Sequence, residues 1–358
     1  DDEIMRNIKL VRQDAMKLRS KGENESDIQE VHESIALDQA SGRRNDGVGG
    51  DDGALITAVN IVYGAYIYLI EHVEEYQNSR DVTQKTRDMQ TRDIKMFCDH
   101  FIYHNRATRD EVIKWVNVTL GQNKGLSRAT LNRTISACRG YWEYLTYFKG
   151  LKATSPFDNV LPRKPKRMTK AQIQKLRVPF QVNDYHKILD TTDDPQLIDL
   201  IKLVAHTGCR ITELCSLKLE DISNDRIQIE DAKTLAGWRT IPIHSEISQT
   251  IKRLVNTSKD KYLFCGLSSN KYGDRSGGLG KRFGRLKTKL GYGEKHVFHS
   301  FRHSFSTQLE NATIPVSSVA RLQGHEVEGE TFGRYSNGLI FQRLKEAIEH
   351  IDWTRPEM

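Results

Sequence analysis

A basic segment without a single acidic residue divides this chain of 358 residues. From Arg163 to Arg177 there are seven lysines and arginines, and Pro162 and Pro165 stiffen its start. Helical patterns precede the segment and mixed patterns follow it, so it predicts a linker between two domains rather than part of one core. A linker of this charge can follow a phosphate backbone, although a merely solvated linker has the same composition.

The charge of the chain is unevenly distributed. Residues 1–60 hold 8 basic and 13 acidic residues, a balance of −5. Of the 54 basic and 47 acidic residues in the whole chain, 46 and 34 therefore fall in the remainder, which has a balance of +12. A basic body favours a polyanionic partner such as nucleic acid.

The cysteines and the hydropathy of the chain indicate a protein of the cytoplasm without a membrane span. The five cysteines are odd in number and form no CxxC pair, which favours reduced thiols in the cytoplasm over disulfides or a zinc knot. The start Asp1-Asp2-Glu3 lacks a methionine, which is typical of a fragment, and no secretory signal follows it. Polar residues interrupt the apolar stretch Ala54–Ile70, so it predicts a buried helix rather than a membrane span.

Helical periodicity dominates from about Arg80 to Gly150. One predicted helix has an apolar face of Ile94, Phe97, Cys98 and Phe101, and another, capped by Ser127, has Leu131, Ile135, Cys138, Trp142 and Leu145. Thr108 and Glu111 match a capping box. The pattern predicts a compact helical domain whose polar faces carry basic residues, which either contact phosphates or are simply solvated.

After Val178 the patterns become mixed. A helix is expected around 197–205, ending at Thr207-Gly208, and strands are expected over 226–230 and 239–243 with a turn between them. A further short strand is expected over 262–265. The predicted fold class is therefore mainly α with a small antiparallel sheet.

Four separated clusters in this half contain residues suited to chemistry. They read HTGCRITELCSL, DAKTLAGWRTIPI, FHSFRHSFSTQL and RLQGHEVEGETFGRYSNG. Taken singly, each has an ordinary explanation, because an arginine near a helix start is usually an ion-pair residue and a lone histidine is usually structural. Their combination and order are far more specific.

Together the clusters resemble the tyrosine recombinase (phage integrase) family. The family's expected residue types occupy six positions: Arg210 in a complete TGxRxxEL context, Lys233, His299, Arg302, His325 and Tyr335. The resemblance covers roughly Arg80 to the C-terminus and implies a helical core-binding domain plus a mixed α/β catalytic domain. The expected organisation is an N-terminal helical segment without an assigned role (1–78), the core-type DNA-binding domain (79–160), the basic linker (161–177) and the catalytic domain with a C-terminal helix (178–358).

The resemblance implies a site-specific DNA recombinase, or integrase, of the kind carried by mobile genetic elements. It would cleave and rejoin DNA through a 3′-phosphotyrosyl intermediate, with no metal and no cofactor. Arg210 and Arg302 would clamp the phosphate, since guanidinium groups donate paired hydrogen bonds to its oxygens. Tyr335 would be the nucleophile, His299 the base that accepts its proton, and Lys233 the acid that protonates the departing 5′-oxygen.

His325 would donate a hydrogen bond to the phosphate. Two departures from the family pattern lie beside it. Gln323 occupies a position where the family often has an apolar residue, and the spacing from His325 to Tyr335 is one residue longer than the commonest one.

The implied partner is double-stranded DNA, bound by a homo-tetramer on two DNA sites, with accessory DNA-bending proteins as further candidates and no membrane. Basic residues of the helical domain and linker are candidate DNA contacts: Arg128, Arg133, Arg163, Lys164, Lys166, Arg167 and Lys170. The apolar face of 339–351 either packs on its own domain or is exchanged between subunits. The expected location is the cytoplasm, at the nucleoid of a prokaryote or as a phage-encoded protein.

Other classes of function fit less well. His299 and His303 have the i,i+4 spacing of a zinc site, but no Glu follows His299. The stretch GDRSGGLGKRFG fails the phosphate-loop pattern, because Arg275 and Arg282 replace a required Gly and Ser/Thr. A catalytically idle DNA-binding regulator and a type IB topoisomerase-like strand-passage enzyme remain as alternatives.

Overall fold

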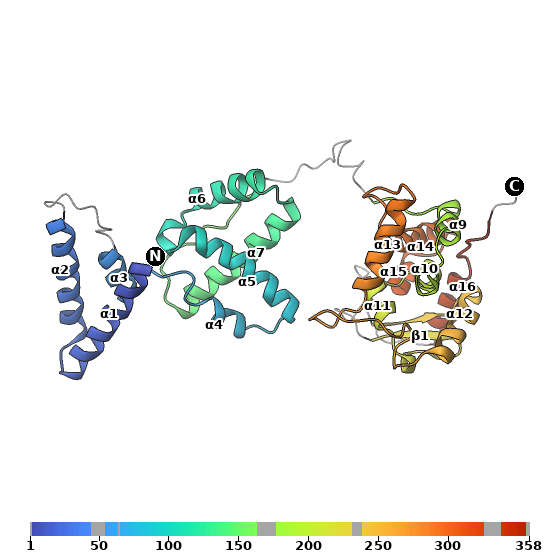
Figure 1. Ribbon diagram of the computed structural model, residues 1–358, viewed down its shortest axis with the longest axis horizontal. Coiled ribbons are helices and arrows are strands. Elements are labelled where there is room, and N and C mark those ends of the chain that lie inside the picture. Colours follow the sequence, from blue (N-terminus) through green and yellow to red (C-terminus); the bar gives the residue numbers. More distant parts are fainter. Residues whose placement is uncertain are drawn as a thin grey trace. The chain divides into compact units, whose positions relative to one another are not determined.

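The computed structural model describes residues 2–43, 54–63, 65–162, 177–230, 238–325 and 338–355. Two compact units divide the chain, Asp1–Pro165 and Lys166–Met358. Both are built mainly from helices, and the described strands form one two-stranded antiparallel sheet in the second unit (Figure 1). The predicted class, mainly α with a small antiparallel sheet, is confirmed.

The first unit begins with three helices, α1 (Asp2–Ser20), α2 (Glu25–Arg43) and α3 (Ala54–Val62). The prediction of a buried helix at the apolar stretch is confirmed for α3, which buries four of its nine residues. The helix ends earlier than expected, because the backbone N–H of Tyr66 turns back to the carbonyl of Asn60 at 2.8 Å. Within the described ranges, no helix is long and apolar enough to cross a bilayer.

The rest of the first unit is a helical domain. Its elements are α4 (Val73–Asn78), α5 (Gln84–Phe101), the 3-10 turn η1 (His104–Arg106), α6 (Arg109–Lys114), the π-helix η2 (Trp115–Asn123) and α7 (Arg128–Phe148). The apolar faces predicted for α5 and α7 are buried, as expected. Ser127 caps α7 as predicted, by accepting from the N–H of Thr130. Thr108 caps α6 by accepting from the N–H of Glu111, which is the Thr108 half of the predicted capping box.

The second unit contains the sheet and most of the site residues. Its elements are α9 (Val182–Asp190), α10 (Pro195–Thr207), α11 (Ile211–Ser216), η3 (Leu219–Asp221), β1 (Arg226–Ile229), β2 (Arg239–Pro242), α12 (Ser245–Thr257), α13 (Gly277–Lys289), α14 (Ser300–Asn311), α15 (Val316–Gln323) and α16 (Gly338–Ile348). The strands pair antiparallel, with Ile227 opposite Ile241 and Ile229 opposite Arg239. Both predicted strands are thereby confirmed.

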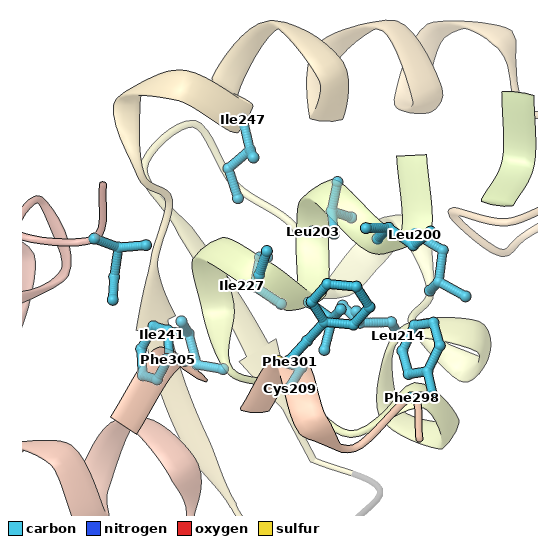
Figure 2. Close-up of a cluster of buried hydrophobic side chains, with 14 of the residues drawn as sticks. Leu200, Leu203, Cys209, Leu214, Ile227, Ile241, Ile247, Phe298, Phe301 and Phe305 are labelled. Atoms are coloured by element: carbon cyan, nitrogen blue, oxygen red, sulfur yellow. The ribbon is translucent and has the colours of Figure 1, made fainter. Parts of the chain in front are cut away.

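A single apolar core holds the elements of the second unit together. Figure 2 shows Phe301 and Phe305 of α14 beside side chains of α10, α11 and both strands. Ile227 and Ile241 point from the sheet into this core. Because the core joins these elements, it fixes the ends of α10, α14 and β2, which carry the site.

Two features of the second unit refine the sequence-based expectations. The short strand expected over 262–265 is wrong: Tyr262 forms only an isolated bridge with Lys218, and Gly266, at a φ of +70°, turns the chain away. The C-terminal segment packs on its own unit, where Ile348, Ile351 and Trp353 are at most 2% exposed. Burial of such side chains ties the segment firmly to the core.

Candidate active site

Arg210 lies at the start of α11, directly after a sharp turn. Gly208 ends α10 in the left-handed conformation, with a φ of +62°, so that the chain reverses before α11 begins. The backbone N–H of Arg210 donates to Oε2 of Glu213 at 2.7 Å, and its Nη1 donates to Oε1 at 2.6 Å. The half-exposed Arg210 guanidinium is thus anchored on one side by a carboxylate.

Glu213 is the centre of a buried ion-pair network. Its side chain is 5% exposed and also receives Nη1 and Nη2 of Arg239, at 3.2 and 2.8 Å. Burial raises the pKa of Glu213, but the hydrogen bonds from Arg239 and Arg210 outweigh it and hold this pKa below the ordinary value. Arg239 also donates through Nε to the carbonyl of Leu322 at 2.8 Å, so it connects β2, α11 and α15.

Arg302 projects from the first turns of α14 and is 2% exposed. Its Nη1 donates to the carbonyl of Gly208 at 2.6 Å, and its Nη2 donates to the carbonyl of Gln323 and to Nε2 of His325, the latter at 2.9 Å. Burial and the nearby cations Arg210 and Arg239 lower the pKa of Arg302 to about 10. It therefore remains a cation at neutral pH.

The cluster has a surplus of positive charge. Arg210 and Arg239 share the carboxylate of Glu213, whereas the Arg302 guanidinium is held by neutral acceptors. Besides burial, the positive charges of Arg210 and Arg239 lower the pKa of Arg302. An anion such as a phosphate would relieve this repulsion, because it can accept two parallel hydrogen bonds from a guanidinium.

His325 follows α15, which ends at Gly324 with a φ of +68°. The His325 side chain is exposed, and its Nε2 accepts the hydrogen bond from Arg302, since a guanidinium has no acceptor. Partial burial first, and then the cations Arg302, Arg210 and Arg239, lower the pKa of His325. The ring is therefore neutral at neutral pH, with its proton on Nδ1.

His299 stands one helical turn before His303, at the start of α14. Although its side chain is exposed to solvent, partial burial lowers its pKa, assisted by His303 and Arg302, to about 4. A neutral imidazole is thus available as a proton acceptor.

The pair His299 and His303 has the spacing of a zinc site, and the two ring centroids lie 5.1 Å apart. In the described part of the chain, however, no group of three His, Cys, Asp or Glu side chains could hold a metal ion.

The structure brings four of the six predicted catalytic residues to one place: Arg210, His299, Arg302 and His325 are linked by hydrogen bonds or mutual electrostatic effects. Lys233 and Tyr335 lie outside the described residues. So do five candidate DNA contacts, Arg163, Lys164, Lys166, Arg167 and Lys170.

The other two candidate DNA contacts already have partners within the first unit. Arg128 donates to the carbonyl of Pro162. Arg133 makes two hydrogen bonds, at 2.8 and 3.1 Å, to Asp93, which is 1% exposed. The Arg133 guanidinium therefore neutralises a buried carboxylate, a role that differs from the predicted phosphate contact.

Three features of the second unit had no role predicted from the sequence. Arg239 binds the carboxylate that anchors Arg210, and Gln323 binds Arg302, in both cases from an element distant in sequence, which periodicity does not reveal. The third is the exposed face of α13, where Gly277, Gly278, Lys281 and Arg285 follow one another at helical spacing. A Cβ atom on either of these glycines would meet no atom within 4 Å, so the backbone at the start of this basic face is exposed to solvent.

Comparison with known proteins identifies the family. The phage integrase family profile matches residues 166–339, and that of the phage integrase N-terminal SAM-like domain matches residues 69–148. Tyrosine recombinase XerC of Bacillus licheniformis is 31% identical over 225 residues, which cover 58% of this chain and 70% of the relative. The chain belongs to the phage integrase family of tyrosine recombinases. Its activity is therefore site-specific recombination of DNA.

Two other relatives match this chain with similar identity and over a similar share of its length. XerC of Bacillus subtilis is 29% identical, covering 58% of this chain and 70% of the relative, and XerA of Pyrococcus furiosus is 28% identical, covering 63% and 75%. The integrase of transposon Tn1549, solved with transposon right end DNA, has a TM-score of 0.58 at 21% identity and covers 79% of this chain and 99% of that one. A lambda integrase tetramer on a Holliday junction has a TM-score of 0.57 at 19% identity, covering 83% and 88%. Because the identities are this low, the similarity to the two structures shows a shared fold only.

Proposed function

We propose that this recombinase cuts DNA by attack of the Tyr335 hydroxyl on a phosphodiester, which leaves a 3′-phosphotyrosyl bond and a free 5′-hydroxyl. The observation that supports this best is the buried Arg302, fixed between the carbonyl of Gly208 and His325 and close enough to Arg210 for its pKa to fall. A buried arginine with neutral acceptors costs free energy in the empty enzyme, and a phosphate would offset that cost.

The two arginines stabilise the charge that develops during attack. As the tyrosine oxygen approaches phosphorus, negative charge accumulates on the two nonbridging oxygens. Arg302 is held rigidly by its carbonyl partners, while Arg210 is half exposed and anchored by Glu213. Their guanidinium groups would each donate to these oxygens, and no reorganisation of the buried one is needed.

Protons move at both ends of the reaction. A phenol with an ordinary pKa near 10 is a weak nucleophile until a base accepts its proton. His299 is neutral because its pKa is lowered to about 4, so it can accept that proton from Tyr335. Lys233 would give a proton to the departing 5′-oxygen, and His325 would donate from its ring to the phosphate.

The reaction conserves the ester. One phosphorus–oxygen bond to the 5′-oxygen breaks while one to the tyrosine oxygen forms, so a 5′-hydroxyl from the same or another strand can later reverse the step. For that reason the reaction requires no ATP, and the residues themselves supply the acid, the base and the electrostatic stabilisation.

We assign the binding of DNA to both units. Residues 79–160 form the core-type binding domain, 161–177 the basic linker and 178–358 the catalytic domain, while 1–78 add a helical segment. The exposed basic face of α13 and the linker cations Arg163, Lys164, Lys166, Arg167 and Lys170 would contact phosphates. Arg128 and Arg133 are less available, because each already has a partner.

We further propose a homo-tetramer on two DNA sites, in the cytoplasm where such DNA lies, with DNA-bending proteins as accessory partners. Lambda integrase, which is similar to this chain in fold, has been solved as a tetramer bound to a Holliday junction. In this chain the C-terminal segment packs on its own unit, where the hydroxyl of Ser245 donates to Glu349 at 2.7 Å. In the tetramer the same contacts would be made with a neighbouring subunit.

A nicked suicide DNA substrate tests the proposed chemistry. The wild-type chain should form a covalent adduct with DNA that resists denaturant, and Tyr335→Phe should form none. Tyr147→Phe is the matched control, because Tyr147 is 81% exposed and lies in the other unit. Binding without an adduct would favour an idle DNA-binding regulator, and relaxation of supercoils without strand exchange would favour a topoisomerase.

A further inference from the structure

Gln323 is a buried polar residue at the end of α15, where the family often has an apolar one. It is 3% exposed. An amide that is removed from water costs free energy unless its hydrogen bonds are replaced. The partners of Gln323 therefore indicate what this amide does.

Both the side chain and the backbone of Gln323 are bonded to α14. Its Nε2 donates to the backbone carbonyl of Arg302 at 2.9 Å and to the hydroxyl oxygen of Ser306 at 2.7 Å. Its own carbonyl accepts from Nη2 of Arg302. One residue thus holds Arg302 at two points, through the main chain and through the guanidinium.

His325 lies two residues after Gln323, just beyond the end of α15. After Gln323 the chain turns at Gly324, and the N–H of His325 returns to the carbonyl of Ala320 at 2.9 Å. The His325 ring then reaches Nη2 of Arg302, the atom that Gln323 also binds. A small displacement of Gln323 would move both groups that face the phosphate.

We propose that Gln323, supported by Ser306, is a positioning residue that holds Arg302 and His325 in register for the scissile phosphate. The inference rests on the proposed function, because it assigns phosphate contact to those two residues. An apolar side chain at position 323 would fill the same volume but would make neither side-chain hydrogen bond. Of the contacts of this residue with α14, only the hydrogen bond from Arg302 to the backbone carbonyl of residue 323 would remain. A loss of positioning affects the chemical step more than the binding of DNA.

Two substitutions of Gln323 test the role of the amide. Gln323→Leu and Gln323→Met remove both side-chain hydrogen bonds at nearly constant volume, and their DNA affinity should stay within about twofold of wild type. The single-turnover rate of adduct formation should fall about tenfold, since misplacement of a catalytic group reduces the rate rather than the affinity. Gln196→Leu is the control: this part-buried glutamine donates to the carbonyl of Cys265 at 3.0 Å and accepts from Arg282 at 2.9 Å. Asp194 also holds Arg282, and neither of the Gln196 hydrogen bonds involves Arg302 or His325, so the loss of this glutamine should leave the rate unchanged.

Ser306→Ala provides a second and milder test. It removes one of the two acceptors of Nε2, together with the longer hydrogen bond, 3.3 Å, that the Ser306 hydroxyl donates to the carbonyl of Arg302. The rate should fall less than in Gln323→Leu. If Ser306 acts through Gln323, the double variant should cleave no more slowly than Gln323→Leu alone, because the two effects are not additive. Independent, multiplying effects of the two substitutions would contradict the proposal.

The outcomes separate this inference from the proposed function. Failure of the wild-type chain to form an adduct contradicts the proposed function. A wild-type adduct rate in Gln323→Leu, Gln323→Met and Ser306→Ala contradicts only the positioning role. An equal loss of DNA affinity and rate in these variants would also overturn it, because that pattern indicates a general structural defect.

Discussion

Arg302 donates a hydrogen bond to Nε2 of His325 across 2.9 Å, and its other Nη atom is bonded to the carbonyl of Gly208. The guanidinium therefore spans the ends of two helices, α10 and α15. Its planar shape makes this possible, since its donors point in fixed, divergent directions. A single ammonium group has no such fork.

The substitution Arg302→Lys should therefore abolish most activity although it keeps the charge. We expect the rate of adduct formation to fall by about 100-fold or more, because a fixed donor to the developing charge is lost. DNA affinity, measured by fluorescence anisotropy, should change little. Arg253→Lys is the control, since Arg253 pairs with Asp199 away from the site, and comparable rates for the two variants would contradict this assignment.

Replacement of Glu213 by glutamine should destabilise the catalytic unit. The neutral amide removes the negative charge that pairs with the buried Arg239, and breaking a buried pair costs about 3–5 kcal/mol. The pKa of Glu213 is lowered in the fold, so its stabilising contribution is full above the ordinary value of 4.5 and is lost as the pH falls through the lowered pKa. Urea unfolding at several pH values measures both effects. An unchanged free energy of unfolding in Glu213→Gln at neutral pH would refute the prediction.

The imidazole of His299 should titrate far below the usual histidine range. Its pKa of about 4 in the free enzyme reflects partial burial and the neighbouring His303 and Arg302. Between about pH 4 and 6.5 the unfolded chain binds more protons at this site, so the contribution of His299 to stability rises with pH across that window. NMR titration, assigned with His299→Gln, measures the pKa, and binding of DNA should raise it. A free-enzyme pKa of 6.5 or above would be inconsistent with the electrostatics of the site.

Gly208→Ala should impair folding and catalysis together. The backbone has a φ of +62°, and a Cβ atom would lie 2.6 Å from Cδ1 of Phe305. Gly291 is a matched control, because it has a φ of +85° but no atom within 4 Å of its Cβ position. The left-handed conformation alone costs about 1–2 kcal/mol in Gly291→Ala, and the clash should add to this in Gly208→Ala. Equal melting temperatures for the two variants would show that the contact with Phe305 is unimportant.

Exchange of the C-terminal segment can be measured by cross-linking. Ser245→Cys and Glu349→Cys place thiols on two side chains that are now hydrogen-bonded at 2.7 Å, and a short bifunctional thiol reagent can span the gap left by the shorter cysteine at 349. The double variant should cross-link within one chain, whereas a mixture of the two single variants on DNA should yield cross-linked dimers only if the segment is exchanged. An absence of dimers from the mixture, with efficient cross-linking in the double variant, would limit the segment to its own subunit.

Local patterns in the sequence predicted much of the fold. The stripe from Leu131 to Leu145 and the turn at Gly208 are encoded within a few residues, by apolar spacing and by the one residue type that tolerates the left-handed conformation. A local pattern was not sufficient for the strand expected over 262–265. Residues that favour strands form one only where a neighbouring strand can pair with them, and Tyr262 forms only an isolated bridge.

Local patterns could not predict ion pairs between residues far apart in the sequence. Arg133 pairs with Asp93, 40 positions away, and Arg239 with Glu213, 26 positions away. Both pairs depend on how helices and strands pack, so an arginine expected to bind phosphate is indistinguishable in sequence from one that neutralises a buried carboxylate. The six proposed catalytic positions were predicted through the family resemblance, whereas Gln323 was noted only as a departure from it.

Identification of the residue that becomes linked to DNA tests the central proposal most directly. The adduct trapped on a nicked suicide substrate would be digested with nuclease and protease, and the modified peptide sequenced by mass spectrometry. We predict a nucleotide joined through its 3′-phosphate to the side chain of Tyr335. A phosphate linked to any other residue, or to the 5′ end of the DNA, would contradict the account.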